Sequence, residues 1–152
     1  METGTERYFE DVEVGSELPT ITKKISIEQL AMYAAVCWDF RPEHYDSGTA
    51  QKYGFRAPYA DGPMITAFLG QVATGWMGPK GIFKKITASY RVMVFPGDIL
   101  SCKGQVTGKR MEGDSNLVEC DVWAENQKAE RVVYGTATVE LPSKEGSALG
   151  NN

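Results

Sequence analysis

The residues best suited to acid–base chemistry lie close together in one short polar segment. Asp39 and His44 are separated by four residues, and His44 is the only histidine in the chain. Imidazole has an unperturbed pKa close to neutrality, so it can accept or donate a proton near pH 7. Pro42 stiffens the segment, and the nearby Ser47 and Gly48 are typical of loops. A carboxylate and an imidazole at this spacing are a candidate general acid–base pair.

A second candidate feature is Asp61-Gly62-Pro63, which precedes a long apolar segment. Proline is common at the start of a helix, and the pattern that follows predicts a helix over about 62–77. The first N–H groups of a helix have no partner within it, so the Gly62 N–H could meet a developing negative charge. A carboxylate, an imidazole and a helix N-terminus together can form an acid–base site with an oxyanion donor.

Three neighbours of these groups each have two interpretations. Asp61 either caps the predicted helix or contributes to substrate binding. Arg41 either forms an ion pair within its loop or binds a charged substrate group. Trp38 either packs against other side chains or lines a pocket, because it adjoins Asp39. We treat all three as candidate substrate-binding residues.

Predicted helices flank the polar segment. Ser26 and Gln29 form a capping-box pattern, and apolar residues at helical spacing then predict a helix over about 27–37. Asp46 is placed to cap a short helix over about 47–53. The helix over 62–77 is apolar around most of its circumference, which predicts that it is buried.

The remaining elements are predicted strands, at about 18–25, 82–95, 99–108, 117–124 and 131–141. In the last three, apolar residues alternate with polar ones, as in antiparallel strands with one buried face. Polar turns are expected at 110–116 and 125–130. The predicted fold class is α+β: a hot-dog fold, in which an antiparallel sheet wraps around one long helix. Such a sheet leaves an edge, so we expect subunits to pair as a dimer.

The composition predicts a single domain over residues 1–142 and a disordered polar tail over 143–152. A net charge of -4 without a basic stripe argues against nucleic acid as a partner. The apolar runs are too short for a membrane span, and the N-terminus shows no signal-peptide pattern. One histidine and three widely spaced cysteines predict neither a metal site nor a disulfide framework. These features favour a cytoplasmic setting.

The polar segment and its flanks resemble a known family. The motif has an aspartate, a proline and a histidine followed by small and aromatic residues: Asp39-x-x-Pro42-x-His44, Ala50, Gly54-Phe55, Pro58 and Gly62. This pattern is similar to that of the (R)-specific enoyl-CoA hydratase or MaoC-like dehydratase family. The similarity extends over most of the chain, including the lead-in over 8–15 and the segment over 94–98.

The resemblance implies a hot-dog enzyme of lipid and fatty acid metabolism. Its reaction would be the reversible addition of water to a trans-2-enoyl thioester, without metal or organic cofactor. Asp39 and His44 would be the catalytic pair, and Gly62 would offer its N–H to the thioester carbonyl. The substrate would be an acyl-CoA or an acyl carrier protein thioester. The assembly would be a homodimer or a higher oligomer, with a homologous partner subunit as an alternative.

Three positions depart from the pattern of the family. Arg41 stands where asparagine is usual, Asp61 where histidine is usual, and Gly70 where many members have serine. Arg41 and Asp61 add charge near the pocket, and Gly70 leaves room for a bulky acyl group. Two alternative functions stay open: a hot-dog thioesterase, which attacks the carbonyl carbon, and an acyl-binding subunit of a hetero-oligomeric dehydratase.

Overall fold

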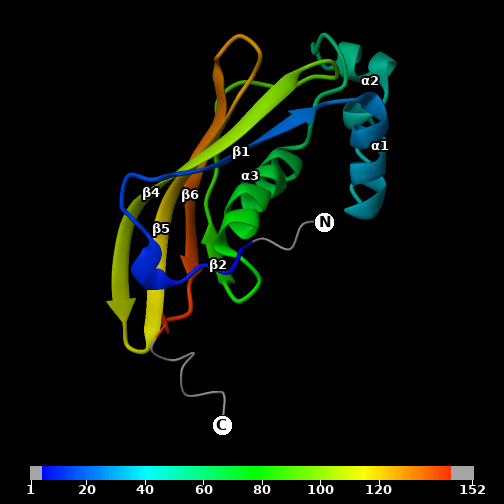
Figure 1. The fold of residues 1–152 in the computed structure, drawn as a ribbon. Helices are drawn as coiled ribbons and strands as arrows, with labels where there is room; N and C mark the ends of the chain where they lie inside the picture. Colours follow the sequence, from blue (N-terminus) through cyan, green and yellow to red (C-terminus); the bar gives the residue numbers. More distant parts are fainter. Residues whose placement is uncertain (1–4, 145–152) are drawn as a thin grey trace.

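The computed structural model describes residues 5–144, and its framework is an antiparallel sheet curled around one helix (Figure 1). The strands are β1 (Glu17–Lys24), β2 (Ile82–Ile86), β3 (Ser89–Tyr90), β4 (Ile99–Glu112), β5 (Ser115–Glu125) and β6 (Arg131–Glu140). Their order in the sheet is β1-β4-β5-β6-β2, and β3 pairs with the remaining length of β6. The predicted hot-dog fold is confirmed.

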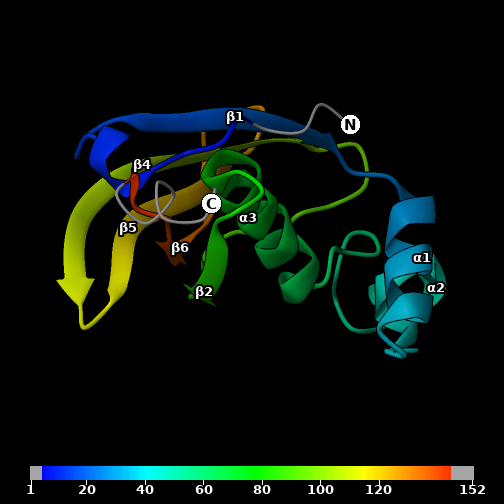
Figure 2. The ribbon, with the colours of Figure 1, turned by 60° about the horizontal axis from the view of Figure 1, so that its bottom comes forward.

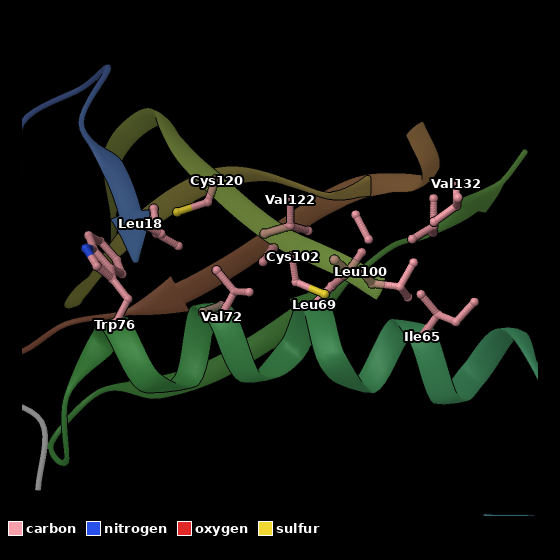
Figure 3. Close-up of a cluster of buried hydrophobic side chains, with 14 of the residues drawn as sticks. Leu18, Ile65, Leu69, Val72, Trp76, Leu100, Cys102, Cys120, Val122 and Val132 are labelled. Carbon is pink, nitrogen blue, oxygen red and sulfur yellow. The ribbon is translucent and has the colours of Figure 1, made fainter. Parts of the chain in front are cut away.

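The central helix α3 (Gly62–Met77) has the predicted bounds and packs on the concave face of the sheet. Figure 3 shows Ile65, Leu69, Val72 and Trp76 pointing from α3 toward the strands. The prediction that α3 is buried nearly all round is wrong for this chain. Its opposite face, which includes Ala67 and Gln71, is exposed, because the sheet covers only one side.

Two shorter helices lie beyond one end of the sheet, beside the N-terminal end of α3 (Figure 2). Helix α1 (Ile27–Val36) begins with the predicted capping box, in which Ser26 and Gln29 exchange two hydrogen bonds. Helix α2 (Ser47–Lys52) begins at Asp46, whose carboxylate accepts a hydrogen bond from the Thr49 N–H. Between them, a short 3₁₀ turn, η2 (Pro42–His44), carries the histidine. A second 3₁₀ turn, η1 (Phe9–Asp11), lies in the lead-in and was not predicted.

Two predictions about the sheet, one of a strand and one of a turn, need correction. The predicted strand over 82–95 is divided into β2 and β3, because the chain at Thr87 crosses closely over Gly135. A Cβ built at Gly135 would lie 1.8 Å from the Thr87 carbonyl oxygen, so only glycine allows this crossing. The polar turn predicted over 110–116 is mostly strand, since β4 and β5 continue to a tight turn at residues 113–114. Hairpin pairing thus overrides the polar composition of this segment.

Nearly all of the tail predicted over 143–152 falls outside the described residues, so its disorder stays a prediction. The single domain over 1–142 also stays a prediction. Among residues 5–144, no helix is long and apolar enough to cross a membrane. The cysteines are free, with Cys37 exposed and Cys102 and Cys120 buried in the core.

Candidate active site

The structure brings three of the predicted site residues together where α1, η2 and α3 meet. Asp39 follows α1, and its N–H donates to the Ala34 carbonyl, which fixes the exit of the chain from the helix. His44 ends η2, and Asp61 immediately precedes α3. One nitrogen or oxygen atom from each of these three side chains lies within 4.8 Å of the others.

The imidazole of His44 is held in one tautomer by the backbone. His44 is buried, with only 4% of the residue exposed, and its Nδ1 atom lies 2.9 Å from the Tyr59 carbonyl oxygen. A carbonyl can only accept a hydrogen bond, so Nδ1 carries the proton. The Tyr59 ring packs edge-on against the imidazole, with ring centroids 4.7 Å apart. Nε2 is buried without a partner among the described residues, so in the neutral ring it presents a lone pair to the cleft.

The carboxylate of Asp39 is clamped by its neighbour Arg41. The guanidinium donates from Nε to both oxygens, at 3.0 and 3.2 Å, and from Nη2 to Oδ2 at 2.9 Å. These hydrogen bonds lower the pKa of Asp39 below its ordinary value, with smaller contributions from the charges of Arg41 and His44. Asp39 therefore remains ionised at neutral pH, so in the resting site it is suited to act as a base.

Arg41→Asn is expected to raise the pKa of Asp39 toward its ordinary range, because the charged donor is lost. The carboxyl carbon signal of Asp39 in a ¹³C NMR titration would then shift at higher pH than in the wild type. The Asp46 carboxylate is an internal control, since its pKa is lowered mainly by its hydrogen bonds to Thr49 and should not change. An unchanged Asp39 midpoint would show that Arg41 is not the cause.

Asp61 and Gly62 form the third side of the site. Asp61 occupies the N-cap position of α3, but its side chain makes no capping hydrogen bond, so the capping interpretation is wrong. The Gly62 N–H has no partner among the described residues, because it precedes the first intrahelical hydrogen bond. The ring of Tyr90 lies against Gly62, so that a Cβ built there would fall 2.7 Å from it. The Tyr90 hydroxyl is fixed by Thr66 Oγ1 at 2.6 Å.

The three side chains line a narrow cleft that shares wall residues with two larger hollows. The cleft residues are Leu30, Tyr33, Ala34, Asp39, His44, Asp61 and Met64. On one side, Asp61 and Gly62 border a cavity of about 390 Å³ that extends under β3 to Tyr90. On the other, Tyr33 and Met64 border an apolar groove of about 330 Å³ between α1 and α3. The two hollows therefore flank the acid–base groups, and because the cleft between them is too narrow in this structure to hold a water molecule, a ligand that reached from one hollow to the other would have to widen it.

Trp38 does not join this cleft. It is 81% exposed, has a positive φ of 57°, and its ring contacts Phe40 rather than a site residue. Arg41 lies at the site, but as the partner of Asp39. The sequence reasoning did not identify the Tyr59 carbonyl, which has no side-chain signal, or Tyr33 and Tyr90, which reach the site only through the packing of α1 and β3 against α3.

Comparisons with known proteins identify relatives of the chain in sequence and in fold. The family model described as MaoC like domain matches residues 11–128. The chain is 27% identical over 134 residues to an (R)-specific enoyl-CoA hydratase of Aeromonas caviae, covering 88% of this chain and 98% of the hydratase. The fold matches the unliganded R-hydratase PhaJ1 of Pseudomonas aeruginosa with a TM-score of 0.80 at 28% identity, covering 90% of this chain and 86% of that one. It also matches the ChsH1-ChsH2 complex of Mycobacterium tuberculosis with a TM-score of 0.76 at 22% identity, covering 85% and 98%.

Proposed function

The chain belongs to the MaoC-like domain family, and from this premise we propose that it is an (R)-specific enoyl-CoA hydratase. It would add water reversibly to the double bond of a trans-2-enoyl thioester. The observation that carries the proposal is the buried, unpartnered Nε2 of His44 beside the ionised Asp39. When the cleft widens to admit the substrate, these two acceptors can hold one water molecule between them and draw a proton from it.

In the hydration direction, the water oxygen forms a bond to C3 as one of its protons moves to Asp39 or His44. The electron pair of the C2–C3 double bond shifts toward the thioester, and C2 then receives a proton from the same pair of groups. The dehydration direction reverses these steps. Because Arg41 disfavours protonation of Asp39, His44 is the better group to deliver the proton to C2.

The enolate charge that develops on the thioester oxygen needs a donor, and the Gly62 N–H supplies it. It is the free first N–H of α3, where the helix dipole also favours negative charge. The thioester would then lie in the cavity beside Gly62, and the acyl chain would run through the cleft into the groove between α1 and α3. The groove is lined mostly by apolar side chains, as an acyl chain requires.

We further propose that the protein works as a hot-dog dimer or higher oligomer on coenzyme A thioesters, without a cofactor. The incompletely covered α3 and the sheet edge at β2 and β3 support an assembly with a second copy. A homologous partner subunit is the alternative, supported by the similarity to the ChsH1-ChsH2 complex. The cytoplasmic setting expected from the sequence stays a prediction.

The test is to mix the purified protein with short, medium and bulky trans-2-enoyl-CoA substrates and follow the conjugated enoyl absorbance. A thiol reagent in parallel samples detects release of coenzyme A. Loss of absorbance without thiol release is expected. Thiol release with the enoyl absorbance retained would instead indicate a thioesterase, and folded protein that turns over no thioester would favour a non-catalytic subunit.

Gly62→Ala is expected to lower kcat by about 10²-fold, in the range seen when one oxyanion donor is lost. The new methyl group would strike the Tyr90 ring and displace the start of α3. The double variant Gly62→Ala, Tyr90→Ala removes this clash and should recover part of the rate. If Gly62→Ala alone keeps the wild-type kcat, the methyl group is accommodated without displacing the Gly62 N–H, and the predicted sensitivity of the rate to this position is refuted.

A further inference from the structure

The chemistry of the cleft fits a second ligand besides the water of the proposed reaction. His44 directs a lone pair from Nε2 toward Asp39 and Asp61, and this nitrogen is buried and has no partner among residues 5–144. The Asp61 side chain makes no ion pair or hydrogen bond within the described residues, so its carboxylate is also available. Two carboxylates and one imidazole are common ligands of divalent transition metals.

The hydrogen bond on the other side of the His44 ring also favours metal binding by Nε2. A metal-binding histidine usually donates its other N–H to a carboxylate or a backbone carbonyl, which fixes the tautomer and the ring orientation. The 2.9 Å contact from Nδ1 to the Tyr59 carbonyl provides this arrangement, in a residue with only 4% of its surface exposed. The ring is therefore held with Nε2 ready to bind before any ion arrives.

We propose that His44, Asp39 and Asp61 bind one divalent transition-metal cation, such as Zn²⁺, which inhibits the protein reversibly. The ion occupies the same Nε2 lone pair that the water needs, so binding excludes hydration. The inhibition rests on the proposed function, whereas the binding site does not. Asp61, which stands where the family usually has histidine, supplies the third ligand.

Two features of the site limit the affinity. Ligand atoms at about 2.1 Å from one tetrahedral zinc ion lie about 3.4 Å apart, so any two atoms of the cluster as far apart as 4.8 Å must approach each other by more than about 1 Å. The carboxylates can do this by side-chain rotation, because both residues are only partly buried. Arg41 places a positive charge beside Asp39, although a carboxylate has enough lone pairs to accept from Arg41 and still bind a metal. We therefore expect moderate affinity, which increases when the charge of Arg41 is removed.

The test is isothermal titration calorimetry of Zn²⁺ into the full chain without an added histidine tag. One ion per chain is expected for the wild type. Asp61→Ala and His44→Asn should each weaken binding by more than the about 10- to 100-fold that loss of an outer-shell partner costs. Arg41→Asn should tighten binding, and Cys37→Ser, which removes the exposed thiol near the site, should leave it unchanged. Circular dichroism of each variant confirms that it is folded.

Binding that is equally tight in Asp61→Ala and His44→Asn, or absent from the folded wild type, would overturn the proposal. Visible absorption of the Co²⁺ complex adds a second readout, since its band intensity reports coordination at nitrogen and oxygen ligands and should disappear in the same variants. The outcome is separable from that of the proposed function. Zinc binding in a chain without hydratase activity would refute only the hydratase, and hydratase activity without zinc binding would refute only the metal site.

Discussion

His44→Asn is expected to lower kcat for a trans-2-enoyl-CoA by about 10²- to 10⁴-fold, the usual contribution of a general acid–base group. Asparagine is chosen because its amide nitrogen can replace Nδ1 as the donor to the Tyr59 carbonyl, 2.9 Å away in the wild type. The variant therefore keeps the anchor of the loop and loses only the Nε2 lone pair. The measurement is the initial rate of enoyl absorbance loss at saturating substrate.

The paired measurement for His44→Asn is the thermal unfolding midpoint. A midpoint near that of the wild type, together with the expected loss of kcat, assigns the effect to Nε2. If the variant retains the wild-type kcat, His44 neither holds the water nor transfers a proton, and the proposed mechanism fails at its central group.

Asp39→Asn is expected to lower kcat by a similar factor of about 10²- to 10⁴-fold, because the amide cannot accept the proton of the attacking water. Asparagine has nearly the same size and planar shape as aspartate, but it cannot form the ion pair with Arg41. This pair is partly exposed, so its loss should change stability little. The rate on enoyl-CoA and the unfolding midpoint are measured together.

Asp46→Asn is a matched control for Asp39→Asn, since it makes the same chemical change seven residues away. Asparagine caps a helix about as well as aspartate, so the hydrogen bond from the Thr49 N–H to the side chain at position 46 should be kept. We expect this control to retain nearly all of the wild-type kcat. Equal losses in the two variants would mean that the effect of Asp39 is one of general charge rather than of catalysis.

The helical half of the fold follows from local sequence signals. The capping box at Ser26, the N-cap at Asp46 and the apolar pattern after Gly62 predict three helices whose bounds agree closely with those observed. Each of these signals acts between residues close together in the chain, so they can be identified without tertiary structure.

The sheet was predicted less accurately, because its strand ends depend on distant residues. The break between β2 and β3 results from the approach of Thr87 to Gly135, which are far apart in the sequence. The exposed face of α3 has a similar cause. The apolar residues of a helix predict that it is buried, but not whether a sheet or a second subunit covers each side.

The candidate site residues could be proposed from the sequence, but the contacts between them could not. Asp39, His44 and Gly62 were proposed from residue type and spacing, and the structure places Asp39 and His44 in one cleft and Gly62 in the adjoining cavity. The clamp of Arg41 on Asp39 and the anchoring of His44 by a backbone carbonyl could not be predicted, because both depend on the exact path of the loop. In the proposed mechanism, these two contacts favour Asp39 as the base in the resting site and direct Nε2 of His44 toward the substrate.

The most direct test of the central claim is to identify the product formed from a trans-2-enoyl-CoA in D₂O. We expect a 3-hydroxyacyl-CoA of (R) configuration, identified by chiral chromatography, with one carbon-bound deuterium at C2, detected by mass spectrometry. This result would show that water adds across the double bond as the paired Asp39 and His44 require. Free coenzyme A with an unaltered enoic acid, or a product without deuterium at C2, would contradict it.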